Sequence, residues 1–311
     1  MLRRILILIP ILFASAVARG QYDVSFAHYW AMEPSFNPAA VGKEAKLNVA
    51  AAYAIQMAGF EHNPNTMYAA ADMPFYFLGT YHGAGVQFVN DVIGIFSHKR
   101  LGLQYAYQHS LFGGKLSLGV QATMLSENLD GSKVDLEDSG DPAFTTSSAS
   151  GTGFDLSAGI YYLHRDWYAG FSVLHLNSPT VELGETNELS ISSTYYLTGG
   201  YNIRLNNPFL KIQTSVLGRT DGVAWRADVT GRLKYEHENR VMYAGVSYSP
   251  ANSVTVLLGG NFHGVHIGYS YEIYTSAINI SNGSHELFVG YQADINIYKK
   301  GRNLHKSVRF L

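Results

Sequence analysis

Apolar and polar residues alternate along most of this chain. Between residues 100 and 108, leucine and tyrosine occupy one face, and arginine and glutamine occupy the other. Residues 115–124 repeat the pattern, with aliphatic side chains opposite lysine, serine, glutamine and threonine. Strict alternation over such lengths predicts β-strands with two different faces, and almost no stretch has helical periodicity.

The strand predicted at residues 225–235 has the sharpest contrast between its two faces. One face carries apolar residues such as Trp225, Val229 and Leu233, and the other face is charged. In a β-sandwich the charged face would meet bulk water, whereas in a membrane barrel it would meet the lumen. For a barrel, four residues are therefore expected to face the lumen: Arg226, Asp228, Arg232 and Lys234.

The alternation predicts about fourteen strands, an even number as in bacterial outer-membrane barrels. The predicted ranges are 46–56, 65–73, 82–90, 100–108, 115–124, 153–163, 166–176, 193–204, 208–218, 225–235, 240–248, 253–262, 264–273 and 285–295. We therefore expect an all-β fold, a transmembrane antiparallel barrel over residues 46–297.

The connections alternate between short and long, which favours a barrel over a sandwich. Tight turns follow most even-numbered strands: 112–114, 164–165, 205–207, 236–239 and 263–264. Long connections follow odd-numbered strands, as at 125–152, 177–192 and 274–284, although 219–222 and 249–252 are short. Because outer-membrane barrels turn tightly in the periplasm, both termini are expected there.

The first twenty residues have the features of a secretory signal peptide. A basic start at Arg3 and Arg4 precedes an apolar run that ends near Val17, shorter than the roughly 20 residues of a membrane-spanning helix. Small residues then permit cleavage before Arg19 or before Gln21. The chain is therefore expected to be exported to the bacterial outer membrane.

Composition agrees with an exported barrel. The chain has 31 Gly, 22 Tyr and only 15% charged residues, as expected where lipid-facing and lumen-facing residues alternate. A large soluble all-β domain is the alternative. Loss of the signal peptide would remove three of the 22 basic residues against 24 acidic ones, which argues against a nucleic-acid partner. With no cysteine, a disulfide or a thiolate metal site is excluded.

Two segments of the mature chain lie outside the predicted strands. Residues 21–45, with Pro34 and Pro38, precede the first strand and are a candidate plug, because a barrel of this size is too wide for wall side chains alone to fill. Residues 298–311 form a basic periplasmic tail that ends in Phe310 and Leu311. The tail is either solvated or a contact for a partner.

No pattern in the sequence predicts an enzyme. There is no nucleophile elbow, and the 12 His residues show no metal-binding spacing. The acidic stretch 130–141 lacks the residue order of a calcium loop, so a solvated surface loop is the favoured interpretation. We therefore expect no catalytic residue, no metal and no cofactor.

The sequence resembles the PorP/SprF family of type IX secretion outer-membrane proteins over essentially the whole mature chain. The similarity begins at Phe26, His28 and Tyr29. It continues through Phe36-Asn37-Pro38-Ala39-Ala40-Val41-Gly42, Asn90-Asp91-Val92-Ile93-Gly94, Ile267-Gly268-Tyr269-Ser270-Tyr271-Glu272, Ser284-His285-Glu286-Leu287 and Ser307-Val308-Arg309-Phe310-Leu311. Val41 and Glu272 depart from the commonest family residues. The motif positions singled out, without an individual role, are Asn37, Pro38, Ala39, Gly42, Asp91, Gly94, Gly268, Tyr269, Tyr271, Glu272, His285, Glu286, Arg309, Phe310 and Leu311.

The resemblance implies a barrel component of type IX secretion. Its expected partners are outer-membrane lipid, periplasmic core proteins of that system and secreted cargo. A transporter of small hydrophobic molecules is the alternative, since fatty-acid channels are also about fourteen-stranded and carry an Asn-Pro-Ala segment before the first strand. Their plugs are rich in Gly and Ala, whereas residues 22–36 here are aromatic and nearly free of Gly. An outer-membrane hydrolase would need a nucleophile and a base together at the outer rim.

Overall fold

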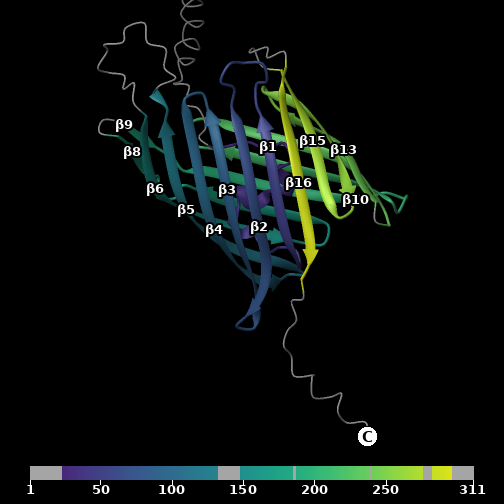
Figure 1. Cartoon of the computed structure of the whole chain (residues 1–311). Coiled ribbons are helices and arrows are strands. Elements are labelled where there is room, and N and C mark those ends of the chain that lie inside the picture. Colours follow the sequence, from purple (N-terminus) through teal and green to yellow (C-terminus); the bar gives the residue numbers. More distant parts are fainter. Residues whose placement is uncertain (1–22, 132–147, 185–186, 239, 276–281, 296–311) are drawn as a thin grey trace, which may run out of the picture.

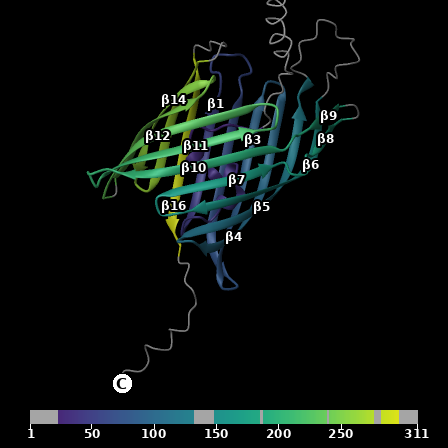
Figure 2. The same cartoon turned by 180° about the vertical axis from the view of Figure 1, so that it is seen from behind.

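Fourteen strands close into one antiparallel barrel (Figures 1 and 2). The computed structural model describes residues 23–131, 148–184, 187–238, 240–275 and 282–295. The predicted signal peptide, most of the acidic stretch 130–141 and the basic tail lie outside the described residues. The closed antiparallel barrel confirms the predicted fold class.

Each barrel strand pairs with its neighbours in chain order, and β1 closes the ring against β16. The strands are β1 (Lys46–Ile55), β2 (Asn65–Phe77), β3 (Thr80–Ile93), β4 (Phe96–Leu111), β5 (Gly114–Leu129), β6 (Ala149–Leu163), β7 (Trp167–Leu174), β10 (Thr194–Arg204), β11 (Leu210–Thr220), β12 (Trp225–His237), β13 (Arg240–Ser249), β14 (Ser253–Phe262), β15 (Val265–Tyr274) and β16 (Ser284–Asp294). No helix in the described part of the chain is long and apolar enough to cross a membrane.

Several strands are longer than the alternation predicts. Both β4 and β5 have 16 residues, because their hydrogen-bonded ladder continues from Phe96–Leu129 to Leu111–Gly114. As a result β3 and β4 are joined by only Gly94 and Ile95, and Gly94 takes a positive φ of 61°. This short connection follows an odd-numbered strand. It is therefore a third exception, after 219–222 and 249–252, to the prediction that tight turns lie on one side of the barrel.

The connection at residues 177–192 is not the plain loop that was predicted. It contains a two-stranded sheet of β8 (Thr180–Leu183) and β9 (Asn187–Ser190). Val181 and Leu183 pack in a buried cluster with Leu125, whose β5 neighbours on the same face line the lumen. The hairpin thus rests on the inner face of β5 and β6.

The two faces of the barrel wall differ sharply in polarity. The outer face exposes large apolar side chains, including Leu103, Met124 and Leu197, each more than 60% exposed. The inner face carries buried polar side chains such as Gln104 and Gln121. An apolar exterior on a closed barrel, in which each strand is hydrogen-bonded to two neighbours, is the arrangement that a lipid bilayer requires.

Arginine at the lipid-facing position Leu103, midway along β4, is expected to destabilise the inserted barrel by about 2–4 kcal/mol. Thr152→Arg is the matched control, since Thr152 is also exposed on the outer face but lies near the end of β6, where the cost falls to about 0–1 kcal/mol. Urea titration of the folded, heat-modifiable form in lipid measures both. Equal stability of the two variants would contradict a bilayer around β4.

The two rims of the barrel are named here by their connections. The short-turn rim holds the turns at 78–79, 112–113 and 263–264, and the long-loop rim holds β8, β9 and the other long connections. Asp294 pairs with Lys46 at the short-turn rim. Asp23 instead contacts Arg219, one residue before the end of β11, at the long-loop rim. The two ends of the described chain therefore lie at opposite rims, and the termini themselves lie outside the described residues.

Candidate functional site

The lumen is occupied by residues 23–45, called here the N-terminal segment and coloured purple inside the barrel in Figure 1. The segment runs from the long-loop rim to the start of β1 through three single-turn 3-10 helices, Tyr29–Ala31, Glu33–Ser35 and Pro38–Ala40. His28, Asn37 and Ala39 are completely buried. These residues form the core of the molecule.

The first residues of the segment are held by charges at the long-loop rim. The Asp23 carboxylate lies 2.6 Å from Nη1 of Arg100 and 3.2 Å from Nε2 of His175. Nδ1 of His175 lies 3.0 Å from the Asp155 carboxylate. Arg219 donates to the backbone carbonyl of Asp23 at 3.1 Å. This buried network ties the segment to β4, β6, β11 and the residue that follows β7.

The network shifts the pKa values of both partners of the ion pair. Burial alone would raise the pKa of Asp23, but His175 and Arg100 outweigh it and hold that pKa well below its usual range. Burial would lower the pKa of His175, yet the carboxylates of Asp23 and Asp155 raise it to about 9. At neutral pH the pair is therefore charged.

Alkaline pH is expected to loosen this end of the segment. Because the folded pKa of His175 lies above its ordinary value of 6.5, the stabilisation is complete below about 6.5 and is lost as pH rises through about 9. A spin label at Val24→Cys in this cysteine-free chain should gain mobility over that interval. The transition should disappear in a His175→Gln background. A pH-independent spectrum in the otherwise wild-type chain would refute the assignment.

The middle of the segment is held by Glu286 on β16. One Glu286 oxygen accepts from the backbone N–H of Ala27 at 2.6 Å, and the other accepts from the backbone N–H of His28 at 3.0 Å and lies 2.6 Å from Nδ1 of that ring. The His28 ring stacks on Phe288, with 5.5 Å between centroids. Two motif residues far apart in sequence, His28 and Glu286, thus meet in the lumen.

The Asn-Pro-Ala motif rests on glycines of the wall. A Cβ added at Gly119 would lie 2.2 Å from the backbone nitrogen of Ala39, and one at Gly159 would lie 2.1 Å from Oδ1 of Asn37. The same Asn37 oxygen caps the third 3-10 helix by accepting from Ala39 N–H at 2.9 Å. A side chain at Gly119 would collide with the backbone of the segment, and one at Gly159 would collide with the side chain of Asn37.

Gly42 ends the segment with a turn. Its φ is 64°, and its N–H donates to Asp72 on β2 at 2.7 Å. A side chain at Gly42 would also meet Cα of Gly83 at 2.7 Å. The sequence indicated the Asn-Pro-Ala motif but not the wall surface that it contacts. A glycine at an inward position of an alternating strand is the signal that could have revealed this surface.

The four charged residues predicted on β12 occupy its inner face but do not form one cluster. Arg226 lies 3.1 Å from both Asp228 and Glu272. Arg232 instead stacks on the Trp30 ring of the segment, 3.5 Å from the centroid. Lys234 lies 3.3 Å from Glu236 towards the short-turn rim.

The remaining motif residues serve different parts of the fold. Asp91 accepts a hydrogen bond from Thr66 at 2.6 Å inside the barrel. A Cβ at Gly268 would meet Nε2 of His28 at 2.6 Å. Tyr269 and His285 are hydrogen-bonded at 2.7 Å on the outer face, and the ring of Tyr271 lies 5.0 Å from that of His285. Arg309, Phe310 and Leu311 lie outside the described residues.

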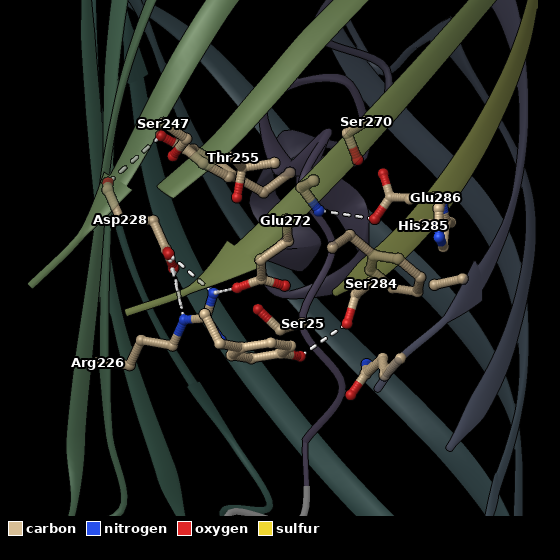
Figure 3. A pocket seen from close by; sticks show the side chains of 16 residues that line it. Ser25, Arg226, Asp228, Ser247, Thr255, Ser270, Glu272, Ser284, His285 and Glu286 are labelled. Atoms are coloured by element: carbon tan, nitrogen blue, oxygen red, sulfur yellow. Dashed lines mark hydrogen bonds and ion pairs between the residues drawn. The ribbon is translucent and has the colours of Figure 1, made fainter. Parts of the chain in front are cut away.

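A polar pocket lies between the segment and strands β12 to β16, near the long-loop rim (Figure 3). It holds about 520 Å³ of unoccupied space, counting space open to solvent. Residues Ser25 to Ala27 and Tyr29 contribute to its lining from the segment. Cross-strand register brings charged and hydroxyl side chains together in its walls: Arg226, Asp228, Ser247, Thr255, Ser270, Glu272, Ser284 and Glu286. The sequence singled out the four charged residues one by one, but it did not show that they share a pocket with these hydroxyls. Among the described residues, no group of three metal-ligating side chains is placed to hold a metal ion.

The family model for the type IX secretion system membrane protein PorP/SprF matches residues 18–291. The chain belongs to the PorP/SprF family. The match includes the N-terminal segment and nearly all of the barrel, and it confirms the resemblance inferred from the motifs. Family membership and the apolar exterior together support a place in the outer membrane. No curated protein sequence matches this PorP/SprF chain.

Solved barrels are similar to this PorP/SprF protein only distantly. The monoaromatic hydrocarbon channel CymD has 10% identity and a TM-score of 0.48, with 88% of this chain and 94% of that chain covered. The toluene transporter TbuX of Ralstonia pickettii has 13% identity and a TM-score of 0.46, with 90% and 96% covered. At this level, likeness says nothing about what the barrel binds.

Proposed function

We propose that this PorP/SprF protein serves type IX secretion as an outer-membrane scaffold whose lumen is closed by its own N-terminal segment. In this role it supports export or surface retention of cargo by binding periplasmic core proteins, and solutes do not pass through it. Family membership supports the secretion role. The filled lumen supports the scaffold role.

The observation that carries the proposal is the number of directions from which the segment is held. Its polar contacts reach eight strands of the wall: β2, β4, β5, β6, β7, β11, β12 and β16. Several buried interactions must break before the segment can move aside. The segment is therefore poorly suited to act as a gate that opens a channel.

The polarity of the interior does not favour transport of small hydrophobic molecules. Sites for such ligands are lined mainly by apolar and aromatic side chains. The pocket beside the segment is lined instead by carboxylates, a guanidinium and hydroxyls. Desolvating these groups against a hydrocarbon would be costly.

We place the short-turn rim in the periplasm, following the usual arrangement of outer-membrane barrels. The chain leaves β16 at Asp294 on that rim, so residues 298–311 would enter the periplasm. The long-loop rim, with the pocket and Asp23, would then face the cell exterior.

Affinity purification tests the secretion role. A tag placed in the connection between β5 and β6, at residues 132–147, leaves the short-turn rim and the tail unchanged. Proteins that co-purify from solubilised outer membranes are identified by mass spectrometry. Enrichment of periplasmic type IX core proteins over a tagged unrelated barrel is expected. Recovery of the barrel with bound lipid but without any secretion component would contradict the proposal.

Removal of residues 304–311 is expected to reduce partner retention and secretion without loss of the folded barrel. Phe310 and Leu311 give the basic tail an apolar end, and its cations add a salt-sensitive attraction. A matched control removes the charge but keeps the length, by changing Lys306 and Arg309 to Gln. Wild-type levels of secretion with the truncated chain would contradict a partner contact, and the tail would then be a solvated end of the chain.

A further inference from the structure

One strand of the barrel wall lacks a neighbour on one side near the long-loop rim. β6 pairs with β5 along its whole length, Ala149–Leu163, but its first β7 partner is at Ala158. β7 ends at Leu174, where β10 begins beside it, so neither strand reaches the end of β6. The residues of β6 before Ala158 therefore have a barrel strand on one side only.

Part of this open side is covered by the residues that follow β7. The N–H of Leu156 donates to Oδ1 of Asn177 at 2.9 Å, and the carbonyl of Leu156 accepts from the N–H of Leu176 at 2.8 Å. The side-chain amide of Asn177 donates to the carbonyl of Phe154 at 2.8 Å. The backbone groups of Leu156 and Phe154 thus point away from β5, toward the open side.

Thr152 and Ser150, the next residues that point the same way, have no such cover. Every second residue of a strand turns its N–H and C=O to the same side, so both residues direct these groups to the open side. Within the described part of the chain, no group bonds to them there. Both side chains are exposed. A row of unpaired N–H and C=O groups is a template for another strand.

This edge lies beyond the apolar band of the outer face. Phe154 and its β5 partner Met124 are exposed apolar residues at the border of the band. Nearer the rim the outward residues are polar, as in the pair of Ser150 with Asn128. The unpaired backbone groups therefore lie outside the hydrocarbon, where a peptide can reach them from water.

The edge carries none of the residues that usually block strand addition. Natural edges are protected by charges or proline. Two other strand ends that lack a neighbour on one side have them, with Pro74 at the end of β2 and Arg226 and Asp228 at the start of β12. Residues Ala149–Gly153 contain neither a charge nor a proline. This edge is therefore open to pairing.

Charge beside the edge favours a basic partner. β8 lies against the inner face of the edge, because a Cβ at Gly151 would lie 2.0 Å from the carbonyl oxygen of Glu182, and Figure 2 shows β8 and β9 beside the end of β6. Glu182 pairs in register with Glu188 on β9, and both side chains are exposed. Neither carboxylate has an ion pair among the described residues. Like charges directly opposite each other are destabilising, so cations on an added strand would relieve this repulsion.

We propose that the β6 edge at Ala149–Gly153 binds an extended basic peptide of another protein, which adds to the wall as a strand and places its cations near Glu182 and Glu188. Backbone hydrogen bonds to Ser150 and Thr152 supply affinity, and the two glutamates select for positive charge. The proposal depends neither on the secretion role nor on the side of the membrane that the long-loop rim faces, so the two can fail separately.

Fluorescence anisotropy with the full chain in detergent tests the site. The probe is a labelled peptide that alternates lysine with valine and is long enough to span Ala149–Gly153, and the comparison peptide has glutamate in place of lysine. The lysine peptide should bind about tenfold more tightly than the glutamate peptide, and added salt should weaken its binding. Methylation of alternate backbone amides should abolish binding for one set of amides and not for the other, since only one set faces β6.

Variants of the chain separate the backbone contacts from the charge. Thr152→Pro should weaken binding about tenfold, because proline removes an N–H that the added strand needs. That N–H points away from β5, so the ladder between β5 and β6 is kept, and heat modifiability confirms the fold. Thr152→Val, which keeps the N–H, is the matched control. Glu182→Gln together with Glu188→Gln should weaken binding about 3-fold to 10-fold.

A disulfide trap locates the peptide without a proline substitution. Because the chain has no cysteine, Ser150→Cys provides a single thiol on the edge, which should cross-link to a cysteine in the lysine peptide under mild oxidation. Asn128→Cys is the control, since Asn128 is exposed and pairs with Ser150 but belongs to β5, which has neighbours on both sides. The proposal is overturned if the wild-type chain does not prefer the lysine peptide, if Thr152→Pro binds it as tightly as Thr152→Val, or if both cysteines cross-link equally.

Discussion

Gly119→Val is expected to expel the N-terminal segment from the lumen while the barrel stays in the membrane. A Cβ at Gly119 would lie 2.2 Å from Ala39 N and 2.4 Å from both Ala39 Cα and the carbonyl carbon of Pro38. These are backbone atoms of a short capped turn, which cannot yield as a flexible side chain would. The strand itself tolerates valine, because β-branched residues fit a pleated sheet.

Cysteine accessibility measures the displacement, since the chain has no cysteine of its own. Ala40→Cys, at a position only 1% exposed, is introduced into each background and treated with a water-soluble maleimide. Labelling should be at least about tenfold faster with Gly119→Val, which corresponds to about 1.4 kcal/mol in the local opening equilibrium. Gly231→Val is the matched control, because a Cβ there meets nothing within 4 Å. Equal labelling in both backgrounds would show that the glycine seat does not hold the segment.

Deletion of residues 22–40 is expected to convert the barrel into an open pore. The fourteen strands retain both neighbours, so the backbone ladder that supports insertion is unchanged. The deletion removes the segment groups that contact Glu286, Arg100 and Arg219, and water then enters the space beside these lumen side chains. Proteoliposomes that carry the deletion variant should swell in isotonic arabinose, whereas those with the intact chain should not.

The fold of the deletion variant is checked first by its heat-modifiable mobility. Loss of insertion would mean that the segment is needed to assemble the barrel. If the variant is folded but its proteoliposomes do not swell, the side chains of the barrel wall alone close the lumen. Either result would count against the segment as a removable plug.

The sequence predicted the barrel because the bilayer imposes a pattern on every strand. Leu101, Leu103 and Tyr105 must meet lipid, while Arg100 and Gln104 must not, and this constraint is visible as period two. Outside the bilayer the constraint ends. For that reason the far ends of β4 and β5 were missed, as were the four-residue strands β8 and β9.

The interior was predicted less completely, because its contacts depend on register and on a segment without regular structure. In the sequence, Gly119 and Gly159 only interrupt the polar, inward positions of their strands. Their role becomes clear from the structure, where the N-terminal segment packs against both of them. His175 gave no signal in sequence, since Asp23 and Asp155 lie far from it along the chain. Among the motif residues, Asn37, Gly42 and Glu286 make hydrogen bonds between the segment and the wall.

Single-channel recording of the purified full-length chain in planar lipid bilayers tests the closed lumen most directly. With the segment seated on the glycines of the wall and tied to Glu286, inserted wild-type barrels should show no stable open-channel current at moderate voltage. Lasting ohmic steps from wild-type barrels whose segment remains protected from maleimide would contradict the account, because ions would then pass a lumen that the segment is proposed to close.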